Sequence, residues 1–315
     1  MSAKLTLPDM TVNIPAKCHP DIDRIERDAT SWAADRVQPD TLRRIRNTRA
    51  GRIVARTVSS DCPRSLLDAY AHFLVWGFWF DDLCVDDVEP DAPLRTAAIA
   101  SVLEILDTGK GTGAAGHGVE AALAEVLNEL EAALSPAQMA RWRQEMRTWF
   151  CSMVFQNAMR QQTPTINSYK ALRRYSVCTY PCLVLIEASH GAHVDREAWP
   201  HTGLEELRVH CSNQVGWSND VVSYHMEREH PGGFWNLPTV YQAHGLTERE
   251  AVQRSADDSV AEAQIFARKE SELRGHLTAG QLCSVDAMRS WMRGCLDWHL
   301  EATDRYFGWA AEERV

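Results

Sequence analysis

Apolar residues recur at intervals of three and four positions along nearly all of the chain after Pro20. This spacing places them on one face of an α-helix, so it predicts a succession of amphipathic helices. The predicted helices cover residues 21–36, 64–80, 94–106, 119–134, 136–161, 166–187, 204–228, 248–273 and 279–307. No segment of useful length alternates apolar and polar residues as a strand would, and no tandem repeat or linker is evident.

Local signals define some of the helix ends. Ser135 precedes Pro136, which predicts a serine N-cap followed by proline at the first helical position. Thr247 and Glu250 have the spacing of a capping box, and Pro181 predicts a kink inside 166–187. We therefore expect an all-α fold, a single-domain bundle of about ten helices over residues 21–315, after an N-terminal segment of residues 1–20.

Composition narrows the class of partner. A net charge of −10 and the absence of any Lys/Arg-rich run argue against nucleic acid. The longest apolar stretch, residues 71–80, is too short to cross a bilayer, and residues 1–21 lack the apolar core of a signal peptide. Nine cysteines without CxxC pairs are expected to be free thiols in a reducing cytoplasm.

An acidic cluster follows the apolar stretch 71–80. It consists of Asp81, Asp82, Asp86 and Asp87, and on a helix Asp82 and Asp86 share one face. Four crowded carboxylates repel one another unless cations screen them, and they are unfavourable at a helix C-terminus. The alternative is a solvated acidic helix end. We expect Asp82 to be the first metal ligand and Asp86 the next, while Asp81 either joins them or pairs with an arginine.

A second polar cluster consists of Asn219, Ser223 and Glu227, at positions i, i+4 and i+8 of a predicted helix. They share one face and offer an amide oxygen, a hydroxyl and a carboxylate, which are hard oxygen ligands that Mg²⁺ accepts. The alternative is the ordinary polar face of an amphipathic helix. Oxygen ligands on two separate helices suit a site that holds several Mg²⁺ ions and a diphosphate between them.

The two clusters also resemble a known family. Residues 219–227 are similar to the NDxxSxxxE motif of the class I terpene synthases, and residues 81–86 are similar to the aspartate-rich motif of that family. Arg173, 46 residues before Asn219, matches the spacing of the diphosphate-sensing arginine of the family, although Arg174 is an adjacent alternative. The resemblance covers about residues 20–307. It departs from the family where a glycine usually breaks a helix, because residues 176–178 are Ser-Val-Cys.

The resemblance implies a microbial, single-domain terpene cyclase of the class I terpenoid synthase fold, with its helices around an apolar pocket. It implies three Mg²⁺ ions, which are held by Asp82, Asp86, Asn219, Ser223 and Glu227. It implies that the substrate diphosphate is bound by Arg173, Arg228, Arg305 and Tyr306. Catalysis is then assigned to Asp81, Asp82, Arg173, Arg305 and Tyr306. Candidate pocket aromatics are Phe73, Trp76, Phe78, Trp79, Trp217, Trp235 and Trp298.

The implied reaction is ionisation of an acyclic isoprenyl diphosphate, followed by cyclisation and release of diphosphate. Farnesyl diphosphate is the favoured substrate and geranylgeranyl diphosphate the alternative. Chain-elongating prenyl diphosphate synthases fit less well, because they have a second aspartate-rich motif where this chain has Asn219, Ser223 and Glu227. A helical interaction protein without catalysis is the alternative of another class. The sequence leaves open the product, the capture of the cation by water, and the formation of a homodimer.

Overall fold

The computed structural model describes residues 5–86, 93–113, 118–191, 203–228, 235–306 and 309, without the side chains of residues 85, 86 and 93–95. These residues form helices joined by turns and loops, and none of them lies in a strand. The prediction of an all-α fold is therefore confirmed. Within the same described residues, no helix combines the length and the apolar character that a bilayer crossing requires.

The first half of the chain forms seven α-helices and a π-helical turn. Their bounds are α1 Ile22–Ala34, α2 Pro39–Thr48, α3 Ala50–Thr57, α4 Arg64–Asp81, η1 Asp82–Asp86, α5 Pro93–Thr108, α6 Val119–Ala133 and α7 Pro136–Met159. The second half contributes α8 Ile166–Ser176, α9 Thr179–Ser189, α10 Leu204–Arg228, α11 Leu237–Ala243, α12 Glu248–Leu273, η3 Arg274–His276, α13 Ala279–Asp297 and η4 Trp298–Ala302.

The predicted start signals operate as expected. The Ser135 hydroxyl accepts a hydrogen bond from the Gln138 backbone N–H, while the Gln138 side chain accepts one from the Ser135 N–H. Thr247 and Glu250 form the same reciprocal capping box at the start of α12. Each box satisfies two backbone donors that a helix N-terminus otherwise leaves without partners.

The structure differs from the prediction in three places. Residues 166–187 form two helices, α8 and α9, rather than one kinked helix. Pro181 lies in the first turn of α9, where a missing N–H costs no hydrogen bond, so the predicted kink at Pro181 is wrong. The helices α2, α3 and α11 were not predicted, and α13 ends at Asp297 before the π-helical turn η4.

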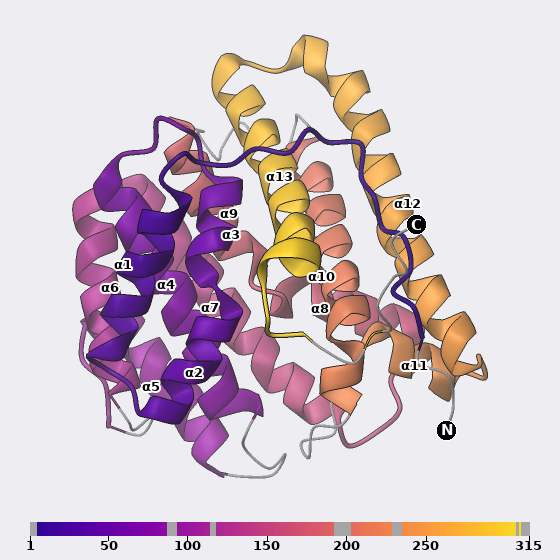
Figure 1. Ribbon diagram of the computed structural model, residues 1–315, viewed down its shortest axis with the longest axis horizontal. Coiled ribbons are helices and arrows are strands. Elements are labelled where there is room, and N and C mark those ends of the chain that lie inside the picture. The colour runs from indigo at the N-terminus through magenta and orange to yellow at the C-terminus, as the bar shows by residue number, and fades with distance from the viewer. Residues whose placement is uncertain are drawn as a thin grey trace.

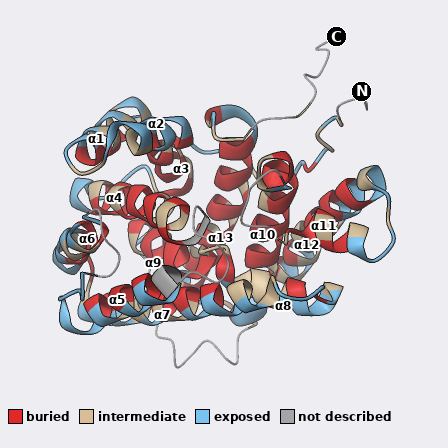
Figure 2. Ribbon diagram, turned by 90° about the horizontal axis from the view of Figure 1, so that it is seen from below, coloured by how far each residue is buried: buried red, intermediate tan, exposed pale blue. Residues whose placement is uncertain are grey.

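The helices pack together in one bundle (Figure 1). Seen along the bundle, α4, α9, α10 and α13 are the most completely buried, while α1, α2, α6 and α7 expose their outer faces (Figure 2). Large aromatic side chains from α4 and α7 pack together in the core, with Trp76 stacked on Phe80 and edge-on to Phe150. Burial of such side chains is the main source of stability in a helical bundle.

The N-terminal segment before α1 is part of this packing. Met10 and Val12 are buried against Val222 and Tyr224 of α10 and Leu296 of α13. The segment runs across α13 and along α12 on the face of the molecule in Figure 1. It therefore covers helices that also form the site described next.

Candidate active site

The first acidic cluster lies where α4 ends and η1 begins. The Arg305 guanidinium donates two hydrogen bonds to the Asp82 carboxylate, at 2.5 Å and 3.2 Å. Asp81 instead lines the central cavity. Neighbouring side chains on a helix point about 100° apart, which explains why the two carboxylates meet different surroundings. An arginine was expected to pair with Asp81, but the structure pairs Arg305 with Asp82. The Asp86 side chain and all of Asp87 lie outside the described residues.

Asp81 is an acid in an unfavourable environment. Burial and the nearby charge of Asp82 raise the pKa of its carboxyl group to about 6, against the opposing effect of Arg305 and Arg173. At neutral pH this carboxylate is charged, but without full compensation. A cation placed near it would lower the electrostatic cost.

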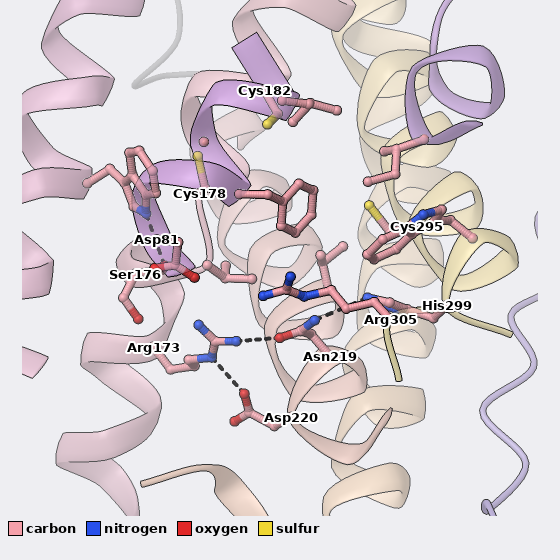
Figure 3. Close-up of a pocket in the computed structure, with 18 of the residues that line it drawn as sticks. Asp81, Arg173, Ser176, Cys178, Cys182, Asn219, Asp220, Cys295, His299 and Arg305 are labelled. Carbon is pink, nitrogen blue, oxygen red and sulfur yellow. Dashed lines mark hydrogen bonds and ion pairs between the residues drawn. The ribbon is translucent and has the colours of Figure 1, made fainter. Parts of the chain in front are cut away.

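The second cluster faces Asp81 from α10 (Figure 3). Asn219 and Glu227 both line the cavity. The Arg173 guanidinium donates to Asn219 Oδ1 and to Asp220 Oδ1, each at 2.7 Å. Ser223 is buried behind Asn219 and donates to its backbone oxygen at 2.8 Å. The structure therefore brings the second cluster and Arg173 to one place, with the guanidinium beside the oxygen atoms proposed as ligands.

The ionisable groups of this cluster influence one another. Burial and the charge of Asp220 raise the pKa of the Glu227 carboxyl group, and a hydrogen bond from Asn236 opposes the rise. Burial lowers the pKa of the Arg173 guanidinium, but Asp220 and its other anionic neighbours outweigh burial and raise it. Arg173 therefore stays charged, and its positive charge partly screens the two buried carboxylates.

Asp220 is a structural partner that the motif did not require. Its carboxylate accepts hydrogen bonds from Arg173, from the Tyr169 hydroxyl at 2.6 Å and from the Leu237 backbone N–H at 3.0 Å. Asp220 thus fixes the position of Arg173 relative to Asn219. The sequence gives no signal for this role except adjacency to Asn219.

The segment from η4 to Tyr306 contributes to the lining of the cavity. Tyr306 lines it and accepts a hydrogen bond from Asn219 Nδ2 at 3.0 Å. His299, which the sequence reading did not single out, lies 3.2 Å from the same nitrogen. Burial, together with Arg173, lowers the pKa of His299 to about 3, so its ring is neutral at physiological pH.

Two predicted diphosphate contacts lie elsewhere in this structure. Arg174, the alternative to Arg173, donates to Asn213 at 3.0 Å and does not line the cavity. Arg228 is paired with Glu248 at the start of α12 and does not line the cavity either. The geometry therefore favours Arg173 over Arg174, and it does not support Arg228 as a lining residue.

The rest of the cavity is apolar. Four of the predicted aromatics line it, namely Phe73, Phe78, Trp235 and Trp298. Trp76, Trp79 and Trp217 are buried but are not among the lining residues. Lining residues that the sequence did not indicate include Trp149, Trp291, Cys178, Cys182 and Cys295. The three thiols gather at one end of the cavity and the charged groups at the other (Figure 3).

The break between α8 and α9 forms part of the cavity wall. Val177 and Cys178 line the cavity, and Cys178 has a left-handed backbone with φ of 61°. Trp149 Nε1 donates to the Ser176 carbonyl oxygen at 3.1 Å and so uses one acceptor at the end of α8. The chain makes, without glycine, the helix break for which the family usually has one.

The comparison with known proteins decides which family this site belongs to. The family described as "Terpene synthase family 2, C-terminal metal binding" matches residues 72–260, which is more than half of the chain. That stretch contains the acidic cluster, the second polar cluster and Arg173. The chain belongs to the class I terpene synthases. It is an enzyme of the lyase type, so the alternative of an interaction protein without catalysis is excluded.

Individual relatives of this terpene synthase agree with the assignment. It is 31% identical to a (+)-corvol ether B and (+)-corvol ether A synthase of Kitasatospora setae, over 93% of this chain and 92% of that protein. It is 29% identical to a sesquiterpene synthase of Metarhizium acridum, over 96% and 88% of the two chains.

Solved structures show the same fold. The linalool/nerolidol synthase of Streptomyces clavuligerus in complex with 2-fluorogeranyl diphosphate superposes with a TM-score of 0.78 and 26% identity, over 95% of this chain and 100% of that chain. The 2-methylisoborneol synthase of Streptomyces coelicolor, in complex with Mg²⁺ and 2-fluoroneryl diphosphate, gives a TM-score of 0.84 at 20% identity, over 96% and 98% of the two chains. The predicted helical fold around an apolar pocket is therefore confirmed for this terpene synthase.

Proposed function

We propose that this terpene synthase is a Mg²⁺-dependent cyclase of farnesyl diphosphate, which yields a terpene hydrocarbon or alcohol and releases diphosphate. The observation that carries the proposal is one cavity with two chemically different ends. Asp81, Arg173 and Asn219 lie at one end and three thiols at the other (Figure 3), and the lining also includes Glu227 and several aromatic side chains. A diphosphate ester of an isoprenoid alcohol needs both environments side by side.

The farnesyl chain is the choice that the relatives support. The Kitasatospora setae protein carries "(2E,6E)-farnesyl diphosphate cyclizing" in its name, and so does the 4-epi-cubebol synthase of Streptosporangium roseum. We carry this substrate over to the present chain, with geranylgeranyl diphosphate as the alternative. All nine cysteines are free thiols, which supports a reducing cytoplasm as the location.

The residues of the charged end fit Mg²⁺. Burial raises the pKa of both Asp81 and Glu227, so each carboxylate would be stabilised by a bound cation. Among the described residues, no three His, Cys, Asp or Glu side chains form a metal cluster by themselves. The proposed set also uses an amide and a hydroxyl oxygen, both of which suit Mg²⁺. The residues that would hold three ions are Asp81, Asp82, Asp86, Asn219, Ser223 and Glu227.

Bound Mg²⁺ would supply positive charge that stabilises the departing diphosphate. The chain itself contributes hydrogen-bond donors, because Arg173, Arg305 and Tyr306 all reach the cavity. Charge-assisted hydrogen bonds from these guanidinium groups would hold the diphosphate at one end of the site. Phe78, Trp149 and the other aromatic rings of the lining would exclude water and stabilise carbocations through their π faces.

Incubation with substrate tests the proposal directly. The purified chain should convert farnesyl diphosphate to a cyclic terpene in Mg²⁺, detected by gas chromatography and mass spectrometry of a pentane overlay. Geranyl and geranylgeranyl diphosphates are run in parallel to decide the chain length. EDTA should abolish turnover, and full turnover in metal-free buffer would exclude the proposed metal dependence.

Variants of the second cluster connect activity to the site. Glu227→Gln and Ser223→Ala should each lower kcat by about 10²-fold or more if the ion that they hold stabilises the leaving group. Glu125→Gln is the matched control, because Glu125 lies on α6, is half exposed and pairs with Arg36. Circular dichroism should show the same helix content in all three variants. Wild-type rates in Glu227→Gln and Ser223→Ala would remove these residues from the metal site.

A further inference from the structure

A second cavity is lined mainly by cationic side chains. It is separate from the central cavity of the candidate active site, which we call the terpene pocket. We call the second cavity the basic cleft and define it by Lys17, Arg56, Arg274, Arg289, Arg293 and Ser290. Its volume is about 230 Å³, which is room for several water molecules or one small anion. None of these six residues lines the terpene pocket.

Four parts of the fold meet at this cleft. Lys17 belongs to the N-terminal segment, Arg56 to the last turn of α3, Arg274 to η3, and Arg289 and Arg293 to α13. The N-terminal segment crosses α13 close to α3 (Figure 1), and Arg293 Nη1 donates to the Ile14 carbonyl oxygen at 3.1 Å. Gly294 allows α3 to approach α13, because a Cβ there would lie 2.7 Å from the Arg56 carbonyl oxygen.

The positive charges of the cleft exceed the negative charges beside them. Arg274 and Arg289 share the buried Glu270, at 2.9 Å and 2.6 Å. Arg293 pairs with Asp297 at 2.8 Å, and Asp286 lines the cleft 3.9 Å from Arg274. In the part of the chain that the structure describes, no ion pair joins Lys17 or Arg56 to a carboxylate. Five cations against three carboxylates leave a local charge of 5 − 3 = +2 on a protein whose net charge is −10.

A buried hydroxyl supplies an independent indication of a ligand. Ser290 lines the cleft and is only 4% exposed, and its Oγ has no hydrogen-bond partner among the residues that the structure describes. A buried hydroxyl without a partner is costly, and a helical serine usually avoids the cost by donating to a carbonyl one turn back. Ser290 is thus available as a donor within an arginine cluster.

We propose that the basic cleft binds a phosphate-type oxyanion with two or more negative charges. The cleft offers guanidinium, ammonium and hydroxyl donors, and among its described lining residues Asp286 is the one carboxylate. Guanidinium groups match the geometry of phosphate oxygens, and several donors suit a tetrahedral anion better than a planar carboxylate. The anion is either free phosphate or diphosphate, or the phosphate group of a small ester.

Titration calorimetry on the full chain in EDTA tests the assignment. Removal of metal suppresses diphosphate binding at the terpene pocket, so the remaining heat reports on the cleft. Inorganic phosphate, inorganic diphosphate and glycerol phosphate are titrated separately at constant ionic strength. Tightest binding of inorganic diphosphate assigns a free anion, and tightest binding of glycerol phosphate assigns an ester. Absence of binding for all three at millimolar concentration overturns the proposal.

Variants decide where the anion binds. The double variant Lys17→Gln, Arg56→Gln should weaken binding at least tenfold, and Ser290→Ala should weaken it severalfold. The double variant Arg43→Gln, Arg64→Gln is the control, because it removes the same charge from two exposed side chains. Equal weakening in both double variants would indicate a diffuse charge effect and no site. Loss of binding in Arg173→Ala would place the anion in the terpene pocket and also refute the cleft.

The test of anion binding at the basic cleft does not depend on catalysis. Binding in EDTA does not require turnover of any isoprenoid, so failure of the proposed cyclase activity leaves the cleft experiment valid. Conversely, a chain that cyclises farnesyl diphosphate but binds no anion in EDTA retains its proposed function and loses only the second site.

Discussion

At the scale of single residues, Asp81 and Asp82 are adjacent carboxylates with opposite surroundings. Asp82 is paired with Arg305, whereas Asp81 faces the cavity and the pKa of its carboxyl group is raised to about 6 by burial and by Asp82. A carboxyl group with a raised pKa in the folded state destabilises that state when it ionises. The site therefore holds an electrostatic cost that a bound cation would offset.

This cost predicts a pH-dependent contribution of Asp81 to the stability of the metal-free protein. Asp81 is protonated in both states below pH 3.8, and its folded pKa is about 6, so its contribution to the free energy of unfolding should fall as pH rises through that interval. Asp81→Asn should remove the loss and stabilise the protein at pH 7.5 by up to about 3 kcal/mol. Urea unfolding in EDTA at pH 4 and pH 7.5 measures the difference.

The stability of Asp82→Asn distinguishes the role of Asp82 from that of Asp81. Asp82 carries the charge paired with Arg305, so its neutralisation should destabilise the protein at pH 7.5, by about 1–3 kcal/mol. If Asp81→Asn is instead as destabilising as Asp82→Asn, the Asp81 carboxylate has a compensating partner in solution. Both variants should lose cyclase activity, so stability alone distinguishes them.

The sequence was sufficient to find both clusters but not to assign their partners. Helical spacing predicts that Asn219, Ser223 and Glu227 share a face, and the structure places all three on α10. It could not predict that Arg305 pairs with Asp82, because 223 residues separate them and only the packed fold brings them together. The role of Asp220 was hidden for the same reason, since its partner Tyr169 lies 51 residues away.

At the scale of elements, the break between α8 and α9 is the feature that sequence signals misplaced. Residues 176–178 contain neither glycine nor proline, so the apolar pattern of 166–187 runs through them without a signal. Pro181, at which the sequence predicts the irregularity, is accommodated in the first turn of α9. The break itself depends on a left-handed Cys178, which local propensity does not predict.

The left-handed backbone predicts an unusual order of stability. At Cys178, with φ of 61°, glycine should be more stable than alanine by about 0.5–1 kcal/mol, since an L side chain is disfavoured there. At Cys182, inside α9, alanine should be the more stable by a similar amount. Urea unfolding of Cys178→Gly, Cys178→Ala, Cys182→Gly and Cys182→Ala measures both orders. The same order at both positions would show that the break is absent in solution.

At the scale of the whole molecule, the site is assembled from distant parts of the chain. Asp81 comes from the end of α4, Arg173 from α8, Asn219 from α10 and Tyr306 from beyond η4. The amphipathic pattern predicts the helices that carry these residues. The cavity between them depends on how the aromatic side chains pack, and therefore the pattern identified only part of its lining.

This assembly predicts that one ligand stabilises the entire fold. Diphosphate with Mg²⁺ at 100 times its Kd should raise the free energy of unfolding by about 2.7 kcal/mol through mass action. Arg173→Ala and Arg305→Ala should each reduce the metal-dependent increment, because each deletes a charge-assisted contact worth about 1.5–3 kcal/mol. Arg174→Ala is the control, since Arg174 contacts Asn213 and does not line the cavity. Unfolding curves of each variant with diphosphate, recorded in Mg²⁺ and in EDTA, isolate that increment. A wild-type increment in both Arg173→Ala and Arg305→Ala would show that neither arginine holds the diphosphate.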